Sequence, residues 1–288
     1  IVLGTGGSSL GGQTVCQLSS ITALSGPSIH FMDNIDPYSF DRLFKIIKPA
    51  RTGFIVISKS GKTAETLTQF LYCWDIFKSE IQRDNDALNL HEHFVVITES
   101  GDRPLRRLAI NWHIKTIDYD KNIGGRFSVL SIVGLLPALI AGVDAYQIRK
   151  GANSVIQQMI SLKDIEEFPP ATGAILNILL AKEHNIRATV LMPYMDQLSI
   201  FGQWFQQLWA ESLGKDGQGT TPVRALGTVD QHSQLQLYLD GPKDKFFTLI
   251  VADQRNMGGK IPKALANQRD LEFIAGKRMG DLITAEQS

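Results

Sequence analysis

Short apolar runs alternate with helical patterns along the first half of the chain. The runs predict strands at five places, Ile1–Leu3, Ile29–Met32, Phe54–Ile57, Phe94–Thr98 and Ile114–Ile117. The segments between them predict helices over Leu10–Leu24, Pro37–Ile47, Ala64–Lys78 and Pro104–Ile110. Strands that are apolar throughout and separated by helices indicate a parallel sheet covered on both faces. Right-handed crossovers between such strands predict a doubly wound α/β domain.

The second half of the chain shows this alternation again, after two further helical patterns at 128–142 and 145–162. A charged segment that contains two prolines, residues 163–170, follows them. Beyond it the pattern predicts helices over Ala171–Glu183, Gln197–Leu213 and Gln231–Leu239, and strands over Ala188–Met192 and Phe246–Val251. We therefore expect two α/β domains, residues 1–145 and 146–288, each with a mainly parallel sheet flanked by helices.

Composition and charge narrow the class of protein. The 288 residues are 43% hydrophobic and 20% charged, which is typical of a soluble globular protein and not of a disordered chain. The formal net charge is zero, so no broad basic field indicates binding to nucleic acid or to an acidic membrane. The longest apolar stretch, Val129–Ile140, is too short to span a membrane. Cys16 and Cys73 lie far apart without metal-like spacing and favour a reducing compartment.

A loop rich in glycine and serine follows the first strand, at the end where parallel sheets bind ligands. Its sequence, GTGGSSLGG over residues 4–12, begins like a dinucleotide-binding fingerprint, but Ser9 takes the place of the third glycine. Asp33, after the second strand, stands where a ribose-binding acid would. A nicotinamide dehydrogenase, a tight turn without a ligand, and a loop for a phosphate or sugar are all open at this point.

The loop after the third strand reads SKSGKT over residues 58–63. It looks like the second half of a nucleotide-binding P-loop, but Val56 stands where the earlier glycine is needed. Ser58, Ser60 and Thr63 would supply three hydroxyls at the start of a helix, whose free amides and dipole attract anions. Capping of that helix needs only one hydroxyl. We therefore favour a phosphate-binding loop for a ligand other than a nucleotide.

Two later residues, Glu211 and His232, are ambiguous when each is taken alone. Glu211 lies near the end of a helix, where the dipole disfavours a carboxylate, and a solvated helix face explains most such glutamates. His232 follows Asp230 in the first turn of a helix and needs no function there. His91 and His93 lack an evident third ligand, so we expect surface histidines and no metal site.

Five segments in the same order nevertheless resemble the phosphoglucose isomerase family. They are GTGGSSLG, ISKSGKTAET, NIGGRFS, QLWAESLGK and GTVDQHSQLQL, which together span residues 4–237. The resemblance implies two sugar-isomerase (SIS) domains, each a doubly wound parallel sheet, in a cytoplasmic protein that works as a homodimer. It also implies reversible aldose–ketose isomerisation of glucose 6-phosphate and fructose 6-phosphate, by ring opening and proton transfer through a cis-enediol. This reaction belongs to glycolysis and gluconeogenesis and uses no metal or redox cofactor.

The resemblance assigns roles to named residues. Glu211 would move the proton between C2 and C1, and Arg126 would stabilise the enediolate. His232, reaching the active site from the partner subunit, would open the sugar ring. Gly125 would allow close approach of the backbone. The other substrate contacts that the resemblance implies are Gly7, Ser8, Ser58, the backbone of Lys59, Ser60, Thr63 and Gln207.

Two departures from the family indicate a fragment of a longer chain. The family carries a further catalytic lysine in a C-terminal helix, whereas the sequence stops at Ser288, and Lys277 does not sit in that motif. The helical region that precedes the family's first strand is also missing. A non-catalytic SIS-domain protein that binds a phosphosugar as a regulator stays the alternative, although it would not need Glu211, Arg126 and His232 together. Activity toward mannose 6-phosphate is left open.

Overall fold

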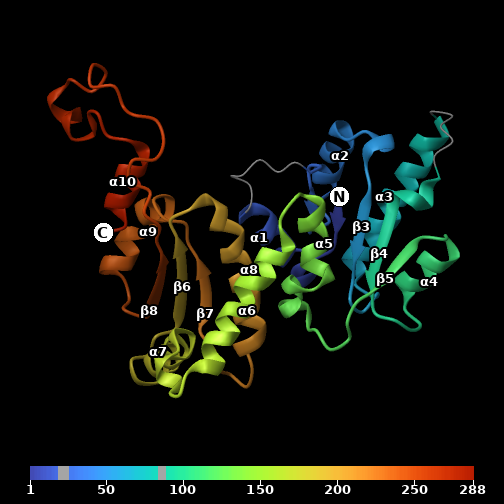
Figure 1. Cartoon of the computed structure of the whole chain (residues 1–288), viewed down its shortest axis with the longest axis horizontal. Helices are drawn as coiled ribbons and strands as arrows, with labels where there is room; N and C mark the ends of the chain where they lie inside the picture. The colour runs from blue at the N-terminus through green and yellow to red at the C-terminus, as the bar shows by residue number, and fades with distance from the viewer. Residues whose placement is uncertain (19–25, 84–88) are drawn as a thin grey trace. The chain divides into compact units, whose positions relative to one another are not determined.

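The computed structural model describes residues 1–18, 26–83 and 89–288, which form two compact units, Ile1–Ser161 and Leu162–Ser288 (Figure 1). The first unit ends with the helix α6 (Ala145–Ser161), one helix beyond the predicted domain boundary after residue 145. That boundary, which concerns domains able to fold independently, stays a prediction.

The first unit is built on a parallel sheet of five strands in the order β2-β1-β3-β4-β5. The strands are β1 (Val2–Leu3), β2 (Phe31–Met32), β3 (Phe54–Ile57), β4 (Phe94–Thr98) and β5 (Lys115–Asp118). Val2 of β1 pairs with Phe31 on one side and with Ile55 on the other. The order of the strands therefore reverses between β1 and β3. Doubly wound sheets bind ligands at this reversal point, beyond the carboxyl ends of the strands.

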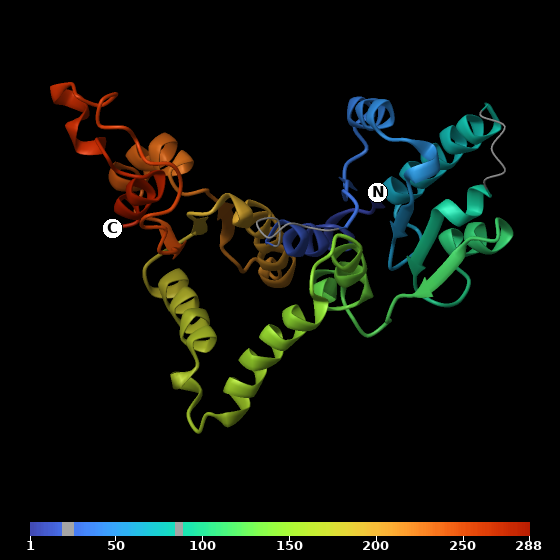
Figure 2. The ribbon, with the colours of Figure 1, turned by 45° about the horizontal axis from the view of Figure 1, so that its top comes forward.

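Helices cover both faces of this sheet. They are α1 (Leu10–Leu18), α2 (Pro37–Ile46), α3 (Ala64–Arg83), α4 (Pro104–Asn111) and α5 (Ile132–Ile140). α6, which ends the unit, is mostly exposed and contacts α5. α3 contacts β1 and β3, α4 contacts β4 and β5, and α1 lies beside α5 (Figure 1 and Figure 2). Short 3-10 turns complete the connections at Gly6–Ser8, Pro49–Arg51, Leu90–His93 and Gly125–Leu130.

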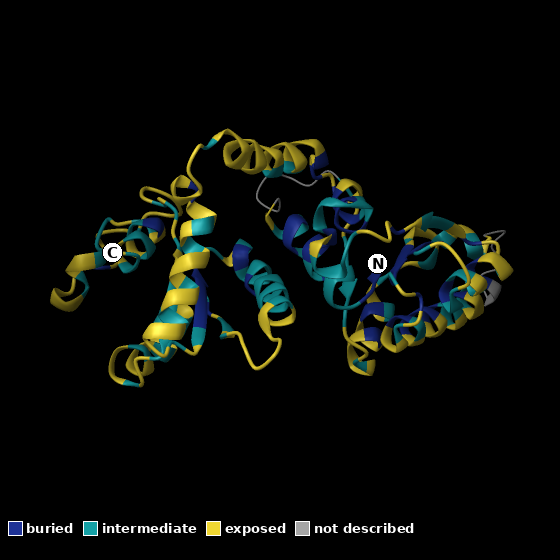
Figure 3. Cartoon of the chain, turned by 90° about the horizontal axis from the view of Figure 1, so that it is seen from below, coloured by how far each residue is buried: buried dark blue, intermediate teal, exposed yellow. Residues whose placement is uncertain are grey.

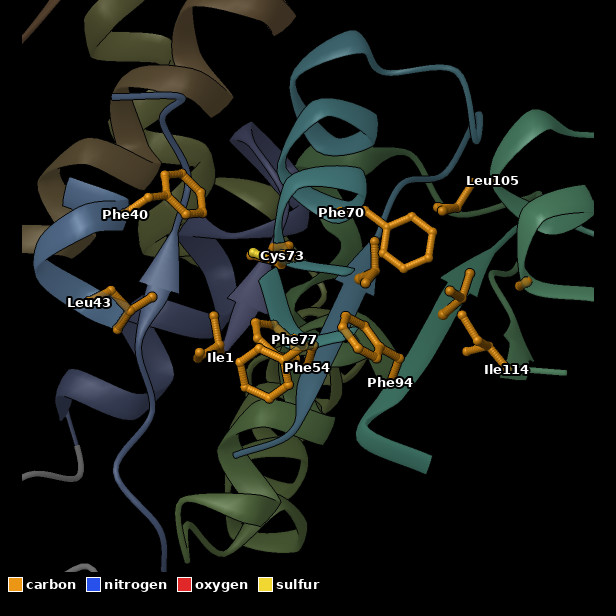
Figure 4. Close-up of a cluster of buried hydrophobic side chains, with 14 of the residues drawn as sticks. Ile1, Phe40, Leu43, Phe54, Phe70, Cys73, Phe77, Phe94, Leu105 and Ile114 are labelled. Atoms are coloured by element: carbon orange, nitrogen blue, oxygen red, sulfur yellow. The ribbon is translucent and has the colours of Figure 1, made fainter. Parts of the chain in front are cut away.

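The core of the first unit follows from the alternation of side chains along buried strands. Phe54 and Phe94 point to the face covered by α2, α3 and α4, where they meet Phe70 and Phe77 of α3 (Figure 4). The rings of Phe54 and Phe94 stack with their centroids 4.6 Å apart. Ile55, the residue after Phe54 on β3, points to the opposite face and belongs to a second buried cluster, on the face covered by α5. Both faces are buried, as the continuous apolar runs predict.

The second unit carries a smaller parallel sheet in the order β7-β6-β8. Its strands are β6 (Ala188–Pro193), β7 (Thr221–Arg224) and β8 (Lys245–Ile250), and its helices are α7 (Pro169–Glu183), α8 (Ser199–Leu213), α9 (Val229–Asp240) and α10 (Met279–Glu286). α8 packs against β6 and β7. Val190, Met192 and Tyr194 form a small buried cluster with Ala225. α7 is exposed along most of its length (Figure 3).

The predicted fold class, an α/β protein with mainly parallel sheets flanked by helices, is confirmed. The apolar pattern does not predict β7, because its sequence contains Pro222, which a sheet tolerates at an edge, and β7 is an edge strand. The helix expected near 128–142 begins later because the Ser131 hydroxyl caps it, accepting a hydrogen bond of 3.3 Å from the Val133 amide. The part of the predicted helix Leu10–Leu24 beyond Leu18 lies outside the described residues.

Candidate functional site

Four loops meet around a hollow of about 340 Å³ at the carboxyl edge of the first sheet. They follow β1, β3, β4 and β5, so the reversal point between β1 and β3 lies among them. The residues that line the hollow are Thr5, Gly7, Ser8, Lys59, Ser60, Thr63, Glu99, Arg103 and Gly125. All the substrate contacts predicted for this unit line it except Ser58.

Ser58 organises the loop after β3 from within. Its side chain is buried, its hydroxyl lies 2.9 Å from the hydroxyl of Thr63, and it accepts a hydrogen bond of 3.1 Å from the Gly61 amide. The Ser60 hydroxyl accepts a hydrogen bond of 3.2 Å from the Lys62 amide and lines the hollow. α3 begins at Ala64, directly after the loop, so the positive end of its dipole lies there. Hydroxyls and this dipole together suit an anion.

Gly61 allows the loop after β4 to pack closely against this segment. Its φ angle is +63°, a left-handed conformation that favours glycine. A Cβ atom at this position would also lie 2.9 Å from Cβ of Arg103 and 3.0 Å from Oγ1 of Thr98. The Leu105 amide donates a hydrogen bond of 3.1 Å to the Gly61 carbonyl. The loops after β3 and β4 are therefore joined by direct backbone contact.

The loops after β1 and β5 are joined in the same manner. A Cβ atom on Gly7 would lie 2.2 Å from the Gly125 carbonyl oxygen and 3.0 Å from the Arg126 amide nitrogen. The buried Ser128 hydroxyl lies within hydrogen-bonding distance of both carbonyls, 3.0 Å from that of Gly7 and 2.8 Å from that of Gly125. These contacts place the Arg126 backbone beside the glycine and serine loop, which the two sequence motifs alone do not indicate.

The Lys59 side chain ties the loop after β3 to the segment that leads into Gly125. Its ammonium donates hydrogen bonds of 3.0 Å to the Lys121 carbonyl and 2.8 Å to the Ile123 carbonyl. It also lies 3.7 Å from Oε1 of Glu99 and 5.7 Å from the ring centroid of Tyr119. Burial raises the pKa of the Tyr119 phenol above its usual value. The Lys59 ammonium is thus held by contacts from two segments, those that follow β4 and β5.

Sequence reasoning missed Glu99 and Arg103 of the hollow and included Thr5 only as part of the loop GTGGSSLGG. One Arg103 nitrogen donates a hydrogen bond of 2.5 Å to Oε2 of Glu99. Both residues belong to the polar segment ESGDRP, directly after β4. Since β4 runs parallel to β3, its carboxyl end falls at the same edge of the sheet. This position in the topology was the signal that could have identified them.

Two predicted site residues, Gln207 and Glu211, lie one turn apart on α8 in the second unit. The Gln207 side-chain nitrogen donates a hydrogen bond of 2.9 Å to Oε1 of Glu211. The side-chain oxygen of Gln207 is buried and has no hydrogen-bond partner among the described residues. A buried amide oxygen of this kind can accept a hydrogen bond from a ligand hydroxyl. The helix therefore presents a carboxylate and a hydrogen-bonding amide together.

His232 lies in the first turn of α9, and the turn before it is strained. Thr228, the residue before the helix, has a φ angle of +68°, which is unusual for a β-branched side chain. A Cβ atom on the preceding Gly227 would lie 2.3 Å from the Tyr194 ring, so only glycine fits. The His232 amide donates a hydrogen bond of 2.9 Å to the Thr228 carbonyl. The predicted site residues thus fall into two sets, one on each unit.

Neither a metal-binding cluster nor a membrane-spanning helix is found in the part of the chain that the structure describes. Among residues 1–18, 26–83 and 89–288, no group of three or more His, Cys, Asp or Glu side chains is placed to hold a metal ion. Within the same residues, no helix has both the length and the apolar character that are needed to cross a membrane.

Comparisons with known proteins agree on one family. A model of the phosphoglucose isomerase family matches residues 1–245. The glucose-6-phosphate isomerase of Rubrobacter xylanophilus is 35% identical over 290 residues, which cover 99% of this chain and 66% of the relative. That of Carboxydothermus hydrogenoformans is 36% identical over 308 residues and covers 100% of this chain. The chain spans between 62% and 66% of the length of these and a third such relative.

Solved structures agree on the fold. A hypothetical protein of Thermus thermophilus superposes with a TM-score of 0.83 at 34% identity, over 99% of this chain and 66% of that one. A glucose-6-phosphate isomerase of Chlamydia trachomatis superposes with a TM-score of 0.78 over 99% of this chain and 54% of that one; at 24% identity it supports the fold alone. The resemblance seen in the five motifs is confirmed, and the chain belongs to the phosphoglucose isomerase family.

Proposed function

We propose that the whole protein interconverts glucose 6-phosphate and fructose 6-phosphate. The observation that carries this proposal is the meeting of the loops GTGGSSLGG, SKSGKT and GGR at one edge of the first sheet, in a chain of this family. A hexose phosphate needs a grip for the phosphate and polar contacts for the sugar. The first unit supplies groups of both kinds in one hollow.

The loop after β3 would hold the phosphate. The Ser60 and Thr63 hydroxyls line the hollow, and the Lys59 amide and the first turn of α3 add donors to them. Ser58 would act through its hydrogen bonds to Gly61 and Thr63, which fix the shape of the loop. Gly7 and Ser8 would contact the sugar from the loop after β1. A hexose gripped at its phosphate end is held in one orientation, which favours reaction at C1 and C2.

Glu211 would transfer the proton between C2 and C1 through a cis-enediol. A well-placed carboxylate base contributes about 10²–10⁴-fold to the rate. Gln207, hydrogen-bonded to Glu211, would orient the carboxylate and contact the sugar. Arg126 would stabilise the negative charge that develops on the enediolate oxygens, while Gly125 leaves room for the substrate. Neither a metal nor a redox cofactor enters these steps.

His232 would open the sugar ring by moving a proton between the two oxygens of the hemiacetal. An imidazole suits this role because its pKa ordinarily lies close to neutrality. We propose a cytoplasmic homodimer in which the histidine serves the active site of the partner subunit. The strained turn at Thr228, directly before α9, is consistent with a histidine that must be placed accurately.

Two alternatives come from other classes of protein. A non-catalytic phosphosugar-binding regulator would use the hollow but would not need Glu211, Arg126 and His232 together. A nicotinamide dehydrogenase would use Asp33 for the ribose, but its carboxylate already accepts a hydrogen bond of 2.7 Å from Gln13, which disfavours that role. Neither alternative explains the agreement of five motifs with one family.

The test is conversion of fructose 6-phosphate by the whole protein, coupled to oxidation of the glucose 6-phosphate formed. Turnover with a KM in the micromolar to millimolar range is expected. Binding of fructose 6-phosphate without turnover would favour the regulator. A fluorescence titration with NADH separates out the dehydrogenase, because saturable NADH binding would contradict the proposal.

A further inference from the structure

A carboxylate stands in the hollow where the proposed function requires an anion to bind. The Glu99 side chain is only 15% exposed and lies between two cations, 3.7 Å from the Lys59 ammonium and 2.5 Å from a guanidinium nitrogen of Arg103. A carboxylate in such a place repels a phosphate, so its presence in a phosphate site needs another explanation. The charged residues that line the hollow, two cations and one anion, leave a net charge of +1.

Arg103 is the second cation of the hollow, and its position is fixed by the backbone. Its Cβ lies so close to the loop after β3 that Gly61 could not carry a side chain. The hydrogen bond from the Leu105 amide to the Gly61 carbonyl holds the two loops together. The Lys59 ammonium differs from the Arg103 guanidinium in that two of its bonds go to the Lys121 and Ile123 carbonyls.

A guanidinium can bind two anions at once. It has five N–H donors in a rigid planar arrangement, so a bond to Glu99 is compatible with further bonds to a phosphate. Arginine binds phosphate oxygens with paired, charge-assisted hydrogen bonds. The carboxylate on one side would hold the guanidinium in the orientation in which its other edge meets the phosphate.

We infer that Arg103 is a further phosphate-binding residue of this site and that Glu99 is the residue that positions it. The inference rests on the proposed function for the identity of the ligand, a hexose 6-phosphate. Its physical content is more general, since it concerns the phosphate group alone. In this arrangement the Glu99 carboxylate orients the Arg103 guanidinium, and this benefit outweighs the repulsion between the carboxylate and the ligand.

The direct test is binding of inorganic phosphate and of 6-phosphogluconate to the whole protein, measured by calorimetry at low ionic strength. Arg103→Gln should weaken binding of both about tenfold or more, because charge-assisted hydrogen bonds are lost. Arg103→Lys keeps the charge but not the planar pair of donors, and should fall between the variant and the wild type. Arg107→Gln is the matched control, since Arg107 forms an exposed ion pair with Asp102 outside the hollow.

For Glu99→Ala, the two possible roles of Glu99 predict opposite changes in phosphate affinity. If Glu99 were only a nearby negative charge, its removal would tighten phosphate binding. A positioning role predicts the opposite, a weakening of about threefold or more, although the hollow becomes more positive. Tighter binding by Glu99→Ala would overturn the positioning role. Thermal melting of each variant shows whether the protein is still folded. If Arg103→Gln is unfolded, the comparison is made with Arg103→Lys instead.

Three outcomes separate this inference from the proposed function. Phosphate binding that depends on Arg103, together with conversion of fructose 6-phosphate by the whole protein, supports both. Phosphate binding that depends on Arg103 without conversion supports the inference and contradicts the function. Equal binding by Arg103→Gln and Arg107→Gln, or no phosphate binding by the wild-type chain, overturns the inference whatever the activity.

Discussion

The hydroxyls of Ser58 and Thr63 lie 2.9 Å apart across the loop after β3, and only Thr63 lines the hollow. Ser58 is buried and also accepts a hydrogen bond from the Gly61 amide, so it maintains the turn that Thr63 and Ser60 depend on. Two residues that look equivalent in the sequence therefore have different physical roles. One acts on the fold of the loop and the other on the proposed ligand.

This difference predicts different effects of the two alanine variants. Ser58→Ala removes the hydrogen bonds of the buried hydroxyl to the Gly61 amide and to Thr63, although the Gly61 amide keeps its hydrogen bond of 3.2 Å to the Ser58 carbonyl. The loss should cost about 0.5–1.5 kcal/mol of stability and also weaken binding of sugar phosphates. Thr63→Ala should raise KM by about tenfold and lower the melting temperature less than Ser58→Ala does, because the buried Ser58 hydroxyl keeps its hydrogen bond from the Gly61 amide. Thermal melting and KM for fructose 6-phosphate check both. A Thr63→Ala variant that binds phosphate-bearing sugar acids normally would mean that the phosphate lies elsewhere.

Gly7 and Gly125 face each other but should respond differently to an added methyl group. A Cβ on Gly7 would lie 2.2 Å from the Gly125 carbonyl oxygen, so Gly7→Ala should displace the loop and lower the stability by more than about 1 kcal/mol. Around Gly125 there is no atom within 4 Å of the added Cβ, and its φ angle is not left-handed. Gly125→Ala should therefore melt like the wild type.

The same Gly125→Ala variant should nevertheless lose activity, because its methyl group would occupy space in the hollow that the substrate needs. We expect kcat/KM to fall by about tenfold or more, equivalent to about 1.4 kcal/mol. Equal melting with reduced kcat/KM is the result that places substrate beside Gly125. Full activity of Gly125→Ala would show that substrate does not approach this backbone.

The apolar pattern predicts some strands of the two sheets well and misses others. β3 and β4 have the predicted bounds because each contains four consecutive apolar residues that are buried or nearly buried on both faces of the sheet. β7 could not be predicted in the same way, because it contains Pro222 and its two end residues are exposed, so its sequence lacks the apolar run of a buried strand. The placement of Ser60 and Thr63 at the hollow could be expected from their spacing in the loop after β3.

The contacts of Glu99 and Ser128 could not be predicted in this way, although the position of Glu99 directly after a predicted strand was a signal. Glu99 enters the hollow only because β4 pairs with β3, and Ser128 binds two carbonyls from loops 118 residues apart in the chain (residues 7 and 125). Contacts of this kind depend on the strand order, which the apolar pattern does not specify. Burial of the Ser58 hydroxyl, as opposed to exposure of Ser60, is likewise a property of the folded turn.

A shared active site predicts complementation between two inactive variants of the whole protein. Glu211→Gln removes the proposed base and His232→Ala the proposed ring-opening group. If His232 serves the partner subunit, a mixed dimer contains one site with both groups intact. Random reassociation then restores about a quarter of the wild-type sites, since half of the dimers are mixed and one site of two is intact in each.

The measurement is isomerase activity after the two variants are denatured together and refolded, with each variant refolded alone as the control. Recovery to about a quarter of the wild-type rate supports sharing of His232 across a dimer. Activity no higher than that of the separate variants would assign His232 to its own subunit's site, or to no site at all.

The most direct test of the central claim is the kcat of Glu211→Gln in the conversion of fructose 6-phosphate by the whole protein. Glu183→Gln is the matched control, because Glu183 also stands at the end of a helix, α7, in the same unit. We expect Glu211→Gln to lose about 10²–10⁴-fold in kcat, since an amide keeps the shape but cannot take the proton, while 6-phosphogluconate still binds and Glu183→Gln keeps full activity. A Glu211→Gln protein that retains more than about a tenth of the wild-type kcat would contradict the assignment of Glu211 as the base.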